Sequence, residues 1–294
     1  MKQSMPAILM SLIFISVYLL SLGLASKFET AGVKAFERPD DPINIAYFFI
    51  ILIVVTVIIL VVKIWMKEII QVIILLAVAA TTFTFFQATL LDILSEPYSI
   101  IASLLLSALI AFLLLIYPEW YVIDFSAILL SVSAVTIFGL SLSIPLVIAL
   151  LIILALYDAI SVYKTKHMID LADTVVDLKL PVLFVIPHKI NYKFRKQVGG
   201  LKKQVKRKER DAFFVGVGDV VIPGILVVSS YSFTASLMLS LSVIAGIVAS
   251  FTILMIFVSK GKPHAGLPFL NTGAILGYIV SSLIFYRSLI GFTI

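Results

Sequence analysis

Two aspartates lie inside long apolar stretches of the sequence, where carboxylates are rare. Asp158 lies in the stretch 144–163, and Asp219 lies in the stretch 213–230. A carboxylate inside a membrane span is costly unless it is paired or hydrated, so it marks a functional site by default. Because the two stretches are consecutive among the long apolar runs, we predict that both carboxylates belong to one site.

Two neighbouring carboxylates can hydrolyse a peptide bond without a metal ion or a cofactor. Close carboxylates do not ionise together easily, so the pair holds one proton. The ionised partner takes a proton from water, while the protonated partner donates to the peptide carbonyl. The gem-diol that forms breaks down when a proton returns to the nitrogen. The pair therefore predicts an aspartic endopeptidase with no cofactor.

The residues just before each aspartate are expected to support the site. Gly216, Val217 and Gly218 precede the second aspartate in the sequence GVGD, and the two glycines let another backbone approach closely. Ordinary packing of small residues in a membrane also explains them. Tyr157 precedes the first aspartate and points from a different helix face, so we expect it to orient the site or to fill the bundle.

Long apolar segments recur along almost the whole chain of 294 residues. The sequence is 62% hydrophobic and 13% charged, whereas soluble domains are about 45–50% apolar and about 25% charged. One helical crossing needs ~20 apolar residues. We therefore predict an all-α polytopic membrane bundle of nine transmembrane helices. The predicted spans are 7–25, 43–62, 69–91, 98–117, 120–140, 144–163, 213–230, 233–258 and 267–286.

The whole chain, 1–294, is predicted to be a single membrane domain. Transmembrane helices 1 to 6 occupy 1–163, a polar loop occupies 164–212, and helices 7 to 9 occupy 213–294. The loop is expected to start with an amphipathic segment, 168–178. An extended segment follows because 178–187 is β-branched, apolar and bracketed by prolines. The remainder of the loop is strongly basic.

The distribution of basic residues predicts the orientation in the membrane. With a cytoplasmic N-terminus, eighteen of the 22 lysines and arginines fall on the cytoplasmic side, and the C-terminus is external. The net charge of +6 comes mostly from the loop, which favours binding to anionic lipid headgroups over binding to nucleic acid. We expect a multi-pass protein of the lipid bilayer, in the cell membrane if the source is prokaryotic. The first span can also be read as a cleaved signal peptide.

Helical geometry predicts similar depths for the two aspartates. At 1.5 Å per residue, Asp158 lies ~9 Å and Asp219 ~12 Å below the cytoplasmic boundary. The two spans run in opposite directions, so the carboxylates can face each other. The chain has no cysteine, and its three histidines lack ligand spacing. No metal site is predicted.

These motifs resemble those of the presenilin and signal peptide peptidase family of intramembrane aspartyl proteases. The resemblance rests on YD at 157–158, GVGD at 216–219 and the proline near the start of the last span. It extends over the chain, with nine spans and the aspartates on the sixth and seventh, and is greatest to the archaeal homologues. The resemblance implies that Asp158 and Asp219 are the catalytic residues.

The third motif of the family, Pro-Ala-Leu, opens the ninth span. Here the corresponding residues are Pro268, Phe269 and Leu270, preceded by Leu267, and the resemblance implies that these four bind substrate. Phenylalanine in place of alanine affects the expected substrate preference more than catalysis. Gly266 and the proline predict backbone groups outside a helix, which can pair with an extended substrate. The segment 180–186 is a candidate for the other side of that ribbon.

The favoured function is cleavage of peptide bonds within transmembrane segments of membrane proteins or remnant signal peptides. The substrate would enter from the lipid and unfold locally. A protease resembling prepilin peptidases also uses GxGD, but that family has fewer spans. A proton- or cation-coupled transporter or channel is the competing class, because intramembrane carboxylates also bind ions. The sequence does not define an oligomeric state.

Overall fold

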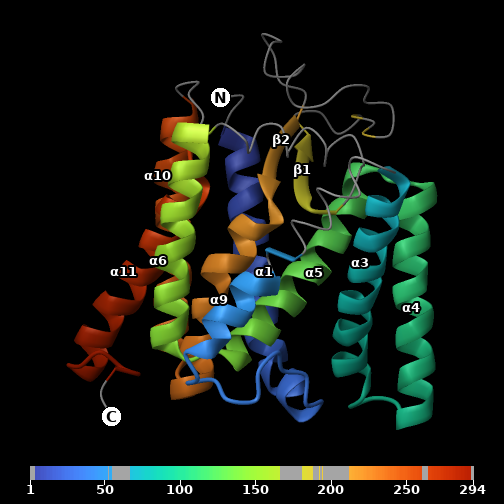
Figure 1. The fold of residues 1–294 in the computed structure, drawn as a ribbon, viewed down its shortest axis with the longest axis horizontal. Coiled ribbons are helices and arrows are strands. Elements are labelled where there is room, and N and C mark those ends of the chain that lie inside the picture. Colours follow the sequence, from blue (N-terminus) through green and yellow to red (C-terminus); the bar gives the residue numbers. More distant parts are fainter. Residues whose placement is uncertain are drawn as a thin grey trace.

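The chain forms a bundle of long helices in the computed structural model, which describes residues 4–51, 53–54, 67–165, 181–187, 192, 194, 212–259 and 264–292. Eight helices within these ranges are long and apolar enough to cross a membrane. They are α1 (Ser4–Thr30), α3 (Lys67–Leu90), α4 (Glu96–Ile116), α5 (Trp120–Ser141), α6 (Ile144–Ile160), α9 (Val217–Thr234), α10 (Leu237–Ser259) and α11 (Gly266–Tyr286) (Figure 1). The predicted all-α membrane bundle is confirmed.

Three predicted segments lie partly or wholly outside the described residues. The second predicted span, 43–62, is helical at 43–51 and 53–54, and its other residues are not described. The predicted amphipathic segment 168–178 also lies outside the described residues. The same is true of the basic stretch 193–210, apart from Phe194.

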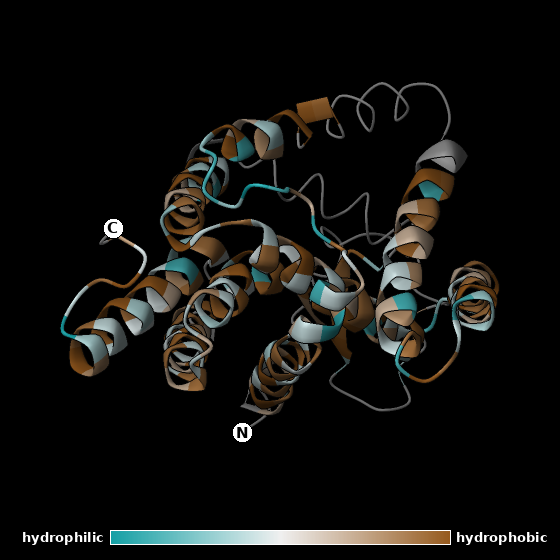
Figure 2. Cartoon of the chain, turned by 90° about the horizontal axis from the view of Figure 1, so that it is seen from below, coloured by the Kyte–Doolittle hydropathy of each residue, from teal (hydrophilic) through white to brown (hydrophobic). Residues whose placement is uncertain are grey.

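The helices carry apolar side chains on their outer surfaces as well as in the core. Leu12 on α1, Leu105 on α4 and Leu156 on α6 are all exposed. Figure 2 shows the hydrophobic colour on the outer sides of the helices. Such surfaces are stable in lipid, where each helix satisfies its own backbone hydrogen bonds.

Helix α9 lies at the centre of the bundle and packs against α1, α5, α6, α10 and α11. Eight consecutive residues near its middle, from Pro223 to Ser230, are buried. Its surroundings therefore fix the position of α9 from several sides, including the first turn, which carries Asp219.

Helix α1 is part of the same core. Met10, Phe14, Val17 and Tyr18 are fully buried, and α1 packs against α5, α9 and α10. This packing is that of a retained helix, and it argues against the signal-peptide reading of the first span.

Helices α10 and α11 approach each other closely through glycines. A Cβ added at Gly246 would lie 2.2 Å from the carbonyl oxygen of Gly273, and a Cβ at Gly273 would lie 2.4 Å from the carbonyl oxygen of Gly246. A larger residue at either position would force the helices apart, as is common at small-residue interfaces in membranes. This contact holds α11 against the bundle.

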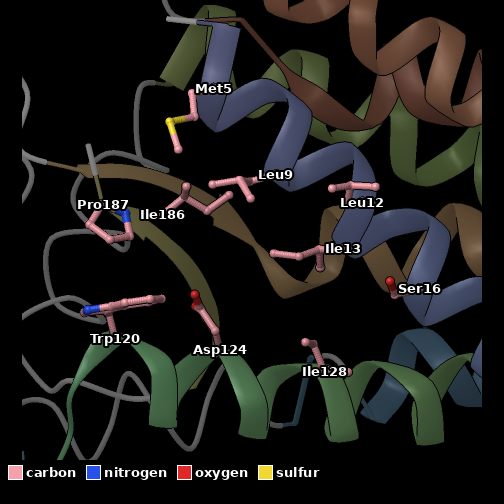
Figure 3. Close-up of a pocket in the computed structure, with 10 residues that line it drawn as sticks. All are labelled: Met5, Leu9, Leu12, Ile13, Ser16, Trp120, Asp124, Ile128, Ile186 and Pro187. Atoms are coloured by element: carbon pink, nitrogen blue, oxygen red, sulfur yellow. The ribbon is translucent and has the colours of Figure 1, made fainter. Parts of the chain in front are cut away.

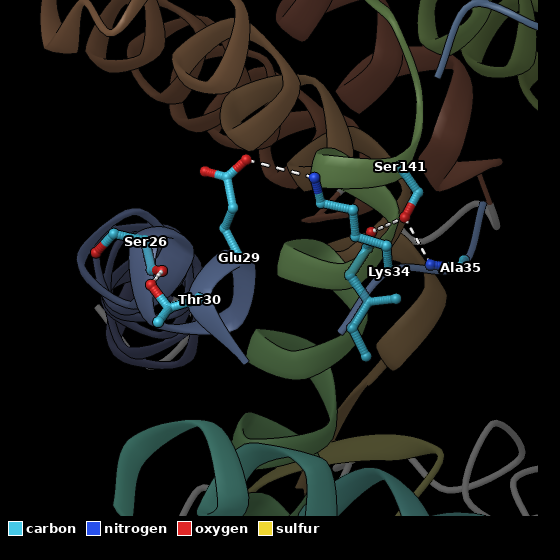
Figure 4. A network of polar contacts seen from close by, with 7 residues as sticks. Ser26, Glu29, Thr30, Lys34, Ala35 and Ser141 are labelled. Carbon is cyan, nitrogen blue, oxygen red and sulfur yellow. Dashed lines mark hydrogen bonds and ion pairs between the residues drawn. The ribbon is translucent and has the colours of Figure 1, made fainter. Parts of the chain in front are cut away.

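The chain that follows α1 is tied by polar contacts to the C-terminal end of α5 and to α1 itself (Figure 4). The backbone N–H of Ala35 donates to Oγ of Ser141 at 2.7 Å. The ammonium of Lys34 contacts the carboxylate of Glu29 at 3.4 Å. These contacts lie at the end of the bundle opposite the strands.

A two-stranded antiparallel sheet lies at the end of the bundle where α1 and α9 begin (Figure 1). Strand β1 (Leu183–Pro187) pairs with β2 (Ala212–Gly216), with Leu183 opposite Gly216 and Pro187 opposite Ala212. The predicted extended segment 178–187 is therefore confirmed over its strand residues.

The strand β2 corrects the predicted start of the seventh span. That span was predicted as helix from residue 213, whereas Phe213 to Gly216 are strand residues and the helix begins at Val217. Short apolar runs with aromatic and β-branched residues fit a strand as well as a helix. Gly216 then acts as the N-cap residue with extended backbone angles, φ −63° and ψ 138°.

Candidate active site

Asp158 lies in the last turn of α6, and its side chain is 3% exposed. The neighbouring Tyr157 is 61% exposed. Consecutive residues on a helix point in different directions, so the aspartate faces the bundle and the tyrosine faces outward. The structure does not bring Tyr157 to the carboxylates. A short π-helix, Ser161–Thr165, follows α6 directly.

Asp219 lies in the first turn of α9 and is partly exposed. Its carboxylate is within hydrogen-bonding range of the backbone N–H of Gly216, the arrangement in which an acidic residue of the first turn caps its own helix. Gly218 is exposed and adds no side chain beside the carboxylate. Val217 is buried, and its N–H donates to the carbonyl of Val182 at 3.0 Å.

The start of α11 brings the two carboxylates together. The backbone N–H of Leu267 donates to Oδ2 of Asp158 at 3.1 Å. A Cβ added to the preceding residue, Gly266, would lie 3.2 Å from both carboxylate oxygens of Asp219. The two aspartates are close enough for a direct electrostatic interaction. Both carboxylates therefore meet at one dipeptide of α11.

The structure corrects the predicted backbone of the Gly-Leu-Pro-Phe-Leu segment. Gly266, Leu267, Pro268, Phe269 and Leu270 form the first turns of α11, and not an extended segment. Proline is well tolerated in the first turn of a helix, where the N–H groups have no partner within the helix. One of these free amides binds Asp158, as helix N-termini bind anions.

The four residues predicted to bind substrate divide into two groups. Leu267 and Leu270 are buried, whereas Pro268 and Phe269 are partly exposed. The ring of Phe269 lies 5.7 Å from that of Phe257. It also lies 6.4 Å from the imidazole of His264, so an aromatic cluster stands beside the start of α11.

The strand β2 changes the predicted depth of Asp219. The estimate assumed a helical rise of ~1.5 Å per residue from the boundary, but a strand rises by ~3.3 Å per residue. Ala212 to Gly216 are strand residues, so the helical rise assumed for this stretch was wrong. The contact of both carboxylates with α11 places them together without that estimate.

Two residues that position the site were not predicted. The hydroxyl of Tyr18 donates to the carbonyl of Val220 at 2.9 Å. The side-chain amide of Asn271 donates to the carbonyl of Leu151 on α6 at 2.8 Å. The tyrosine braces the turn that carries Asp219, and the asparagine joins α11 to α6. Both use backbone carbonyls as acceptors, and sequence spacing gives no sign of such partners.

No metal site is visible in the part of the chain that the structure describes, where no three histidine or acidic side chains gather around one point. His264 lies 3.4 Å from the hydroxyl of Tyr163. His167 and His188 are outside the described residues. The described site therefore offers two carboxylates and backbone amides as its polar groups.

Comparison with known proteins agrees with this geometry. The sequence matches the family described as "Signal-peptide peptidase, presenilin aspartyl protease" over residues 10–287. The chain belongs to this family. No curated protein sequence matches it.

Two solved structures described as a presenilin family intramembrane aspartate protease are similar to the chain along most of its length. The structure in space group C222 is 30% identical with a TM-score of 0.68, and it covers 94% of this chain and 96% of the solved chain. The structure in space group P2 is 34% identical with a TM-score of 0.70 and the same coverage, 94% and 96%.

Family and fold together confirm the predicted enzyme class, an intramembrane aspartic endopeptidase of the presenilin family. They also confirm a multi-pass membrane protein. The transporter or channel alternative is not supported, and the matching family is not that of the prepilin peptidases.

Proposed function

We propose that Asp158 and Asp219 are the catalytic carboxylates of this protease. The observation that carries the proposal is the convergence of both side chains on Gly266 and Leu267 at the start of α11. One aspartate is buried and the other is partly exposed. A water molecule and a peptide can therefore reach the pair from the side of Asp219.

The chemistry follows from one proton shared by the two carboxylates. The ionised carboxylate removes a proton from water as the oxygen attacks the peptide carbonyl carbon. The protonated carboxylate donates its proton to the carbonyl oxygen, which gives a neutral gem-diol. A proton then passes to the amide nitrogen, the C–N bond breaks, and a carboxylic acid and an amine leave.

The substrate is a transmembrane segment of a membrane protein, or a remnant signal peptide, that is extended locally at the site. A helical substrate hides its amide bonds, so extension must precede attack. The sheet supports this step because β2 runs directly into the helix that carries Asp219 and pairs with β1 on one side. An extended substrate can add to the other side of β2 by backbone hydrogen bonds.

The remaining predicted residues have distinct parts in this proposal. Pro268 and Phe269 line the entry to the pair, since they are partly exposed. Leu267 donates its backbone N–H to the carboxylate of Asp158 and so helps to hold it in place. Gly216 and Gly218 leave room for the substrate backbone, and Val217 anchors the strand pair. Tyr157 faces the lipid, where it meets the arriving substrate.

The orientation follows from charge. Most of the basic residues fall in the loop 164–212 and in the other segments that the predicted topology places on the same side of the membrane, and the positive-inside rule assigns that side to the cytoplasm. The N-terminus is then cytoplasmic and the C-terminus external, with the protein in the cell membrane if the source is prokaryotic. The aspartate pair lies nearer the cytoplasmic face.

The decisive experiment is cleavage of single-span substrates by the purified chain in proteoliposomes, with the fragments identified by mass spectrometry. Asp158→Asn and Asp219→Asn should each abolish cleavage. Asp92→Asn is the matched control, because this half-exposed carboxylate contacts Lys27 at 3.0 Å away from the site. Intact cleavage by either active-site variant would refute the proposal. Loss of proton or cation flux without any proteolysis would favour transport.

A further inference from the structure

Two buried carboxylates, one within α5 and one at its N-cap, contact the segment that contains β1, apart from the aspartate pair. Asp124 is 9% exposed and Glu119 is 7% exposed. Oδ1 of Asp124 accepts a hydrogen bond from the backbone N–H of Val185 at 2.7 Å. Oε2 of Glu119 accepts one from the backbone N–H of Phe194 at 3.0 Å. Among the described residues neither carboxylate forms an ion pair, and both bind backbone donors.

The N–H of Val185 lies on the edge of β1 that faces away from β2. The N–H of Val217 donates to the carbonyl of Val182, so these two residues form a hydrogen-bonded pair. In an antiparallel ladder such pairs alternate with pairs that exchange no hydrogen bonds. Val185 and Phe214 stand opposite each other in one of the pairs that exchange no hydrogen bonds. Its backbone groups point outward, and Asp124 occupies that outer edge.

The two strands therefore differ in the edge that they offer to a third strand. On the outer edge of β1, Val185 is already bound and Pro187 has no N–H to donate. On the outer edge of β2, the backbone of Phe214 has no hydrogen-bond partner among the described residues. An incoming extended peptide finds an occupied edge on one side and an open edge on the other.

An apolar cavity lies beside the occupied edge (Figure 3). Its volume is about 290 Å³, and Asp124 is its only acidic lining residue. Its wall is formed by α1, the start of α5 and the end of β1, including Met5, Leu9, Trp120, Ile186 and Pro187. The cavity leaves space into which β1 could move, or a peptide could enter, if the aspartate did not hold the strand.

A carboxylate within a membrane helix costs free energy, and here it accepts a hydrogen bond from a single backbone N–H on β1. Its advantage is strength, because a hydrogen bond from an N–H to a carboxylate is stronger and shorter than one to a neutral acceptor. The 2.7 Å distance is at the short end of that range. The bond fixes β1, and the ladder transmits that position to β2 and to the first turn of α9.

We propose that Asp124 is a positioning residue that closes the outer edge of β1 and fixes the strand pair, so that extended substrates add only to β2, in register with Asp219. Glu119 holds the chain beyond β1 in the same way. This inference rests on the proposed function. It concerns where a substrate binds and which bond is cut, and not the chemical step.

The test is kinetics and product analysis of the full chain in proteoliposomes with a single-span substrate that the wild-type protein cleaves. Asp124→Ala removes the acceptor. We expect KM to rise by about tenfold, as for the loss of one charged hydrogen bond, and cleavage to spread over neighbouring peptide bonds. Asp124→Asn retains an acceptor oxygen but not the charge, so its KM and product set should lie between those of the wild-type protein and those of Asp124→Ala.

Ser126→Ala is the control for a change within α5. Ser126 is buried on the same helix, and its hydroxyl donates to the carbonyl of Val122 within that helix at 2.8 Å, so its loss should leave KM and products unchanged. A transition-state analogue confined to the cleaved bond, too short to reach β2, should bind Asp124→Ala with unchanged affinity, because the aspartate pair is intact. A merely structural role would reduce binding of the analogue as well.

Val185→Pro removes the donor from the strand side without touching α5. Proline is tolerated at an outward-facing position of an edge strand. This variant should reproduce the raised KM and spread products, and the double variant should be no worse than either single one. Asp124→Ala is uninformative if it fails to fold or no longer binds the analogue, and Val185→Pro then decides. A normal KM and product set in Val185→Pro overturn the proposal, whereas a raised KM and spread products support it.

The two proposals fail in different ways. If the wild-type chain cleaves no membrane substrate, or if Asp219→Asn still cleaves, the proposed function is wrong. If the wild-type chain cleaves and both Asp124→Ala and Val185→Pro leave KM and the product set unchanged, the positioning role is wrong and the catalytic assignment stands.

Discussion

The hydroxyl of Tyr18 on α1 donates a hydrogen bond to the carbonyl oxygen of Val220 on α9, at a distance of 2.9 Å. Val220 directly follows Asp219, so this bond braces the turn that carries the carboxylate. The turn needs a brace because Pro223 stands four residues after Asp219. Proline has no N–H, so the carbonyl of Asp219, four residues before it, receives no helical hydrogen bond from that position.

Tyr18→Phe should therefore reduce catalysis as well as stability. The ring is retained and only the donor is lost, which costs about 1 kcal/mol of unfolding free energy. We expect kcat to fall by roughly tenfold, because small displacements of a catalytic group are costly. Thermal unfolding in detergent and single-turnover cleavage measure the two effects.

Tyr278→Phe is the matched control for that variant. The hydroxyl of Tyr278 also donates to a backbone carbonyl, that of Ile290, but this bond joins α11 to the C-terminal end of the chain. Stability should fall by a similar amount while kcat stays unchanged. Equal losses of kcat in both variants would contradict a specific brace at Asp219.

Gly266→Ala is expected to be more damaging than Gly216→Ala. The added Cβ at Gly266 would lie 3.2 Å from both carboxylate oxygens of Asp219, whereas the nearest atom to a Cβ at Gly216 is Oδ2 of that aspartate at 3.5 Å. The first contact is tight and requires the carboxylate to shift by a few tenths of an ångström, while the second is an ordinary van der Waals contact. Rates of cleavage should fall by about tenfold in Gly266→Ala and much less in Gly216→Ala.

A control for alanine in place of glycine is available on α1. Gly23→Ala meets nothing within 4 Å and should leave cleavage unchanged. If Gly266→Ala is as active as Gly23→Ala, the contact between α11 and Asp219 does not govern the position of the carboxylate.

Leu267→Pro removes the amide that binds Asp158 at 3.1 Å. We expect kcat to fall by about tenfold or more, because a bond to a charged group is worth roughly 1.5–3 kcal/mol. Leu267→Ala keeps the amide and removes a buried side chain, so it separates the two contributions. A comparison of kcat for the pair in the same lipid is the measurement, and equal values would exclude a role for the amide.

Phe269→Ala tests the departure from the family motif. The phenylalanine ring contacts Phe257 and His264 beside the start of α11, so its removal widens the entry to the site. The ratio of kcat/KM for substrates with large and small residues at the cleaved bond should shift by about tenfold toward the large ones. A uniform change in kcat/KM for all substrates would indicate damage to the site and not a change of specificity.

The aspartate pair could be predicted because carboxylates in apolar runs are visible in a sequence. The contacts that place the pair could not, because the amide of Leu267 is a backbone group and belongs to no side-chain motif. Tyr18 gave no signal for a similar reason, since its acceptor is a backbone carbonyl 202 residues away in the sequence. Asp124 was visible as a charge near a helix end, but its partner lies on a strand that spacing does not connect to it.

The helical bundle followed from apolar segments of the right length, and the described helices agree with the predicted spans to within a few residues, except at α9. There the strand β2 occupies residues that were predicted to be helical. A run of five apolar residues has no periodicity that separates strand from helix. The pairing with β1 decides the outcome, and that pairing is a tertiary contact.

The register of the sheet has a consequence for engineering. Because Pro187 stands opposite Ala212, the chain leaves β1 and returns to β2 at neighbouring points. Doubling the length of a loop whose ends are held together raises the free energy of loop closure by only about 0.6 kcal/mol. Between Phe194 and Ala212 the connection can therefore accept inserted tags, reporters or protease recognition sequences, while Phe194 keeps its hydrogen bond to Glu119 and the hydrolytic centre keeps its shape.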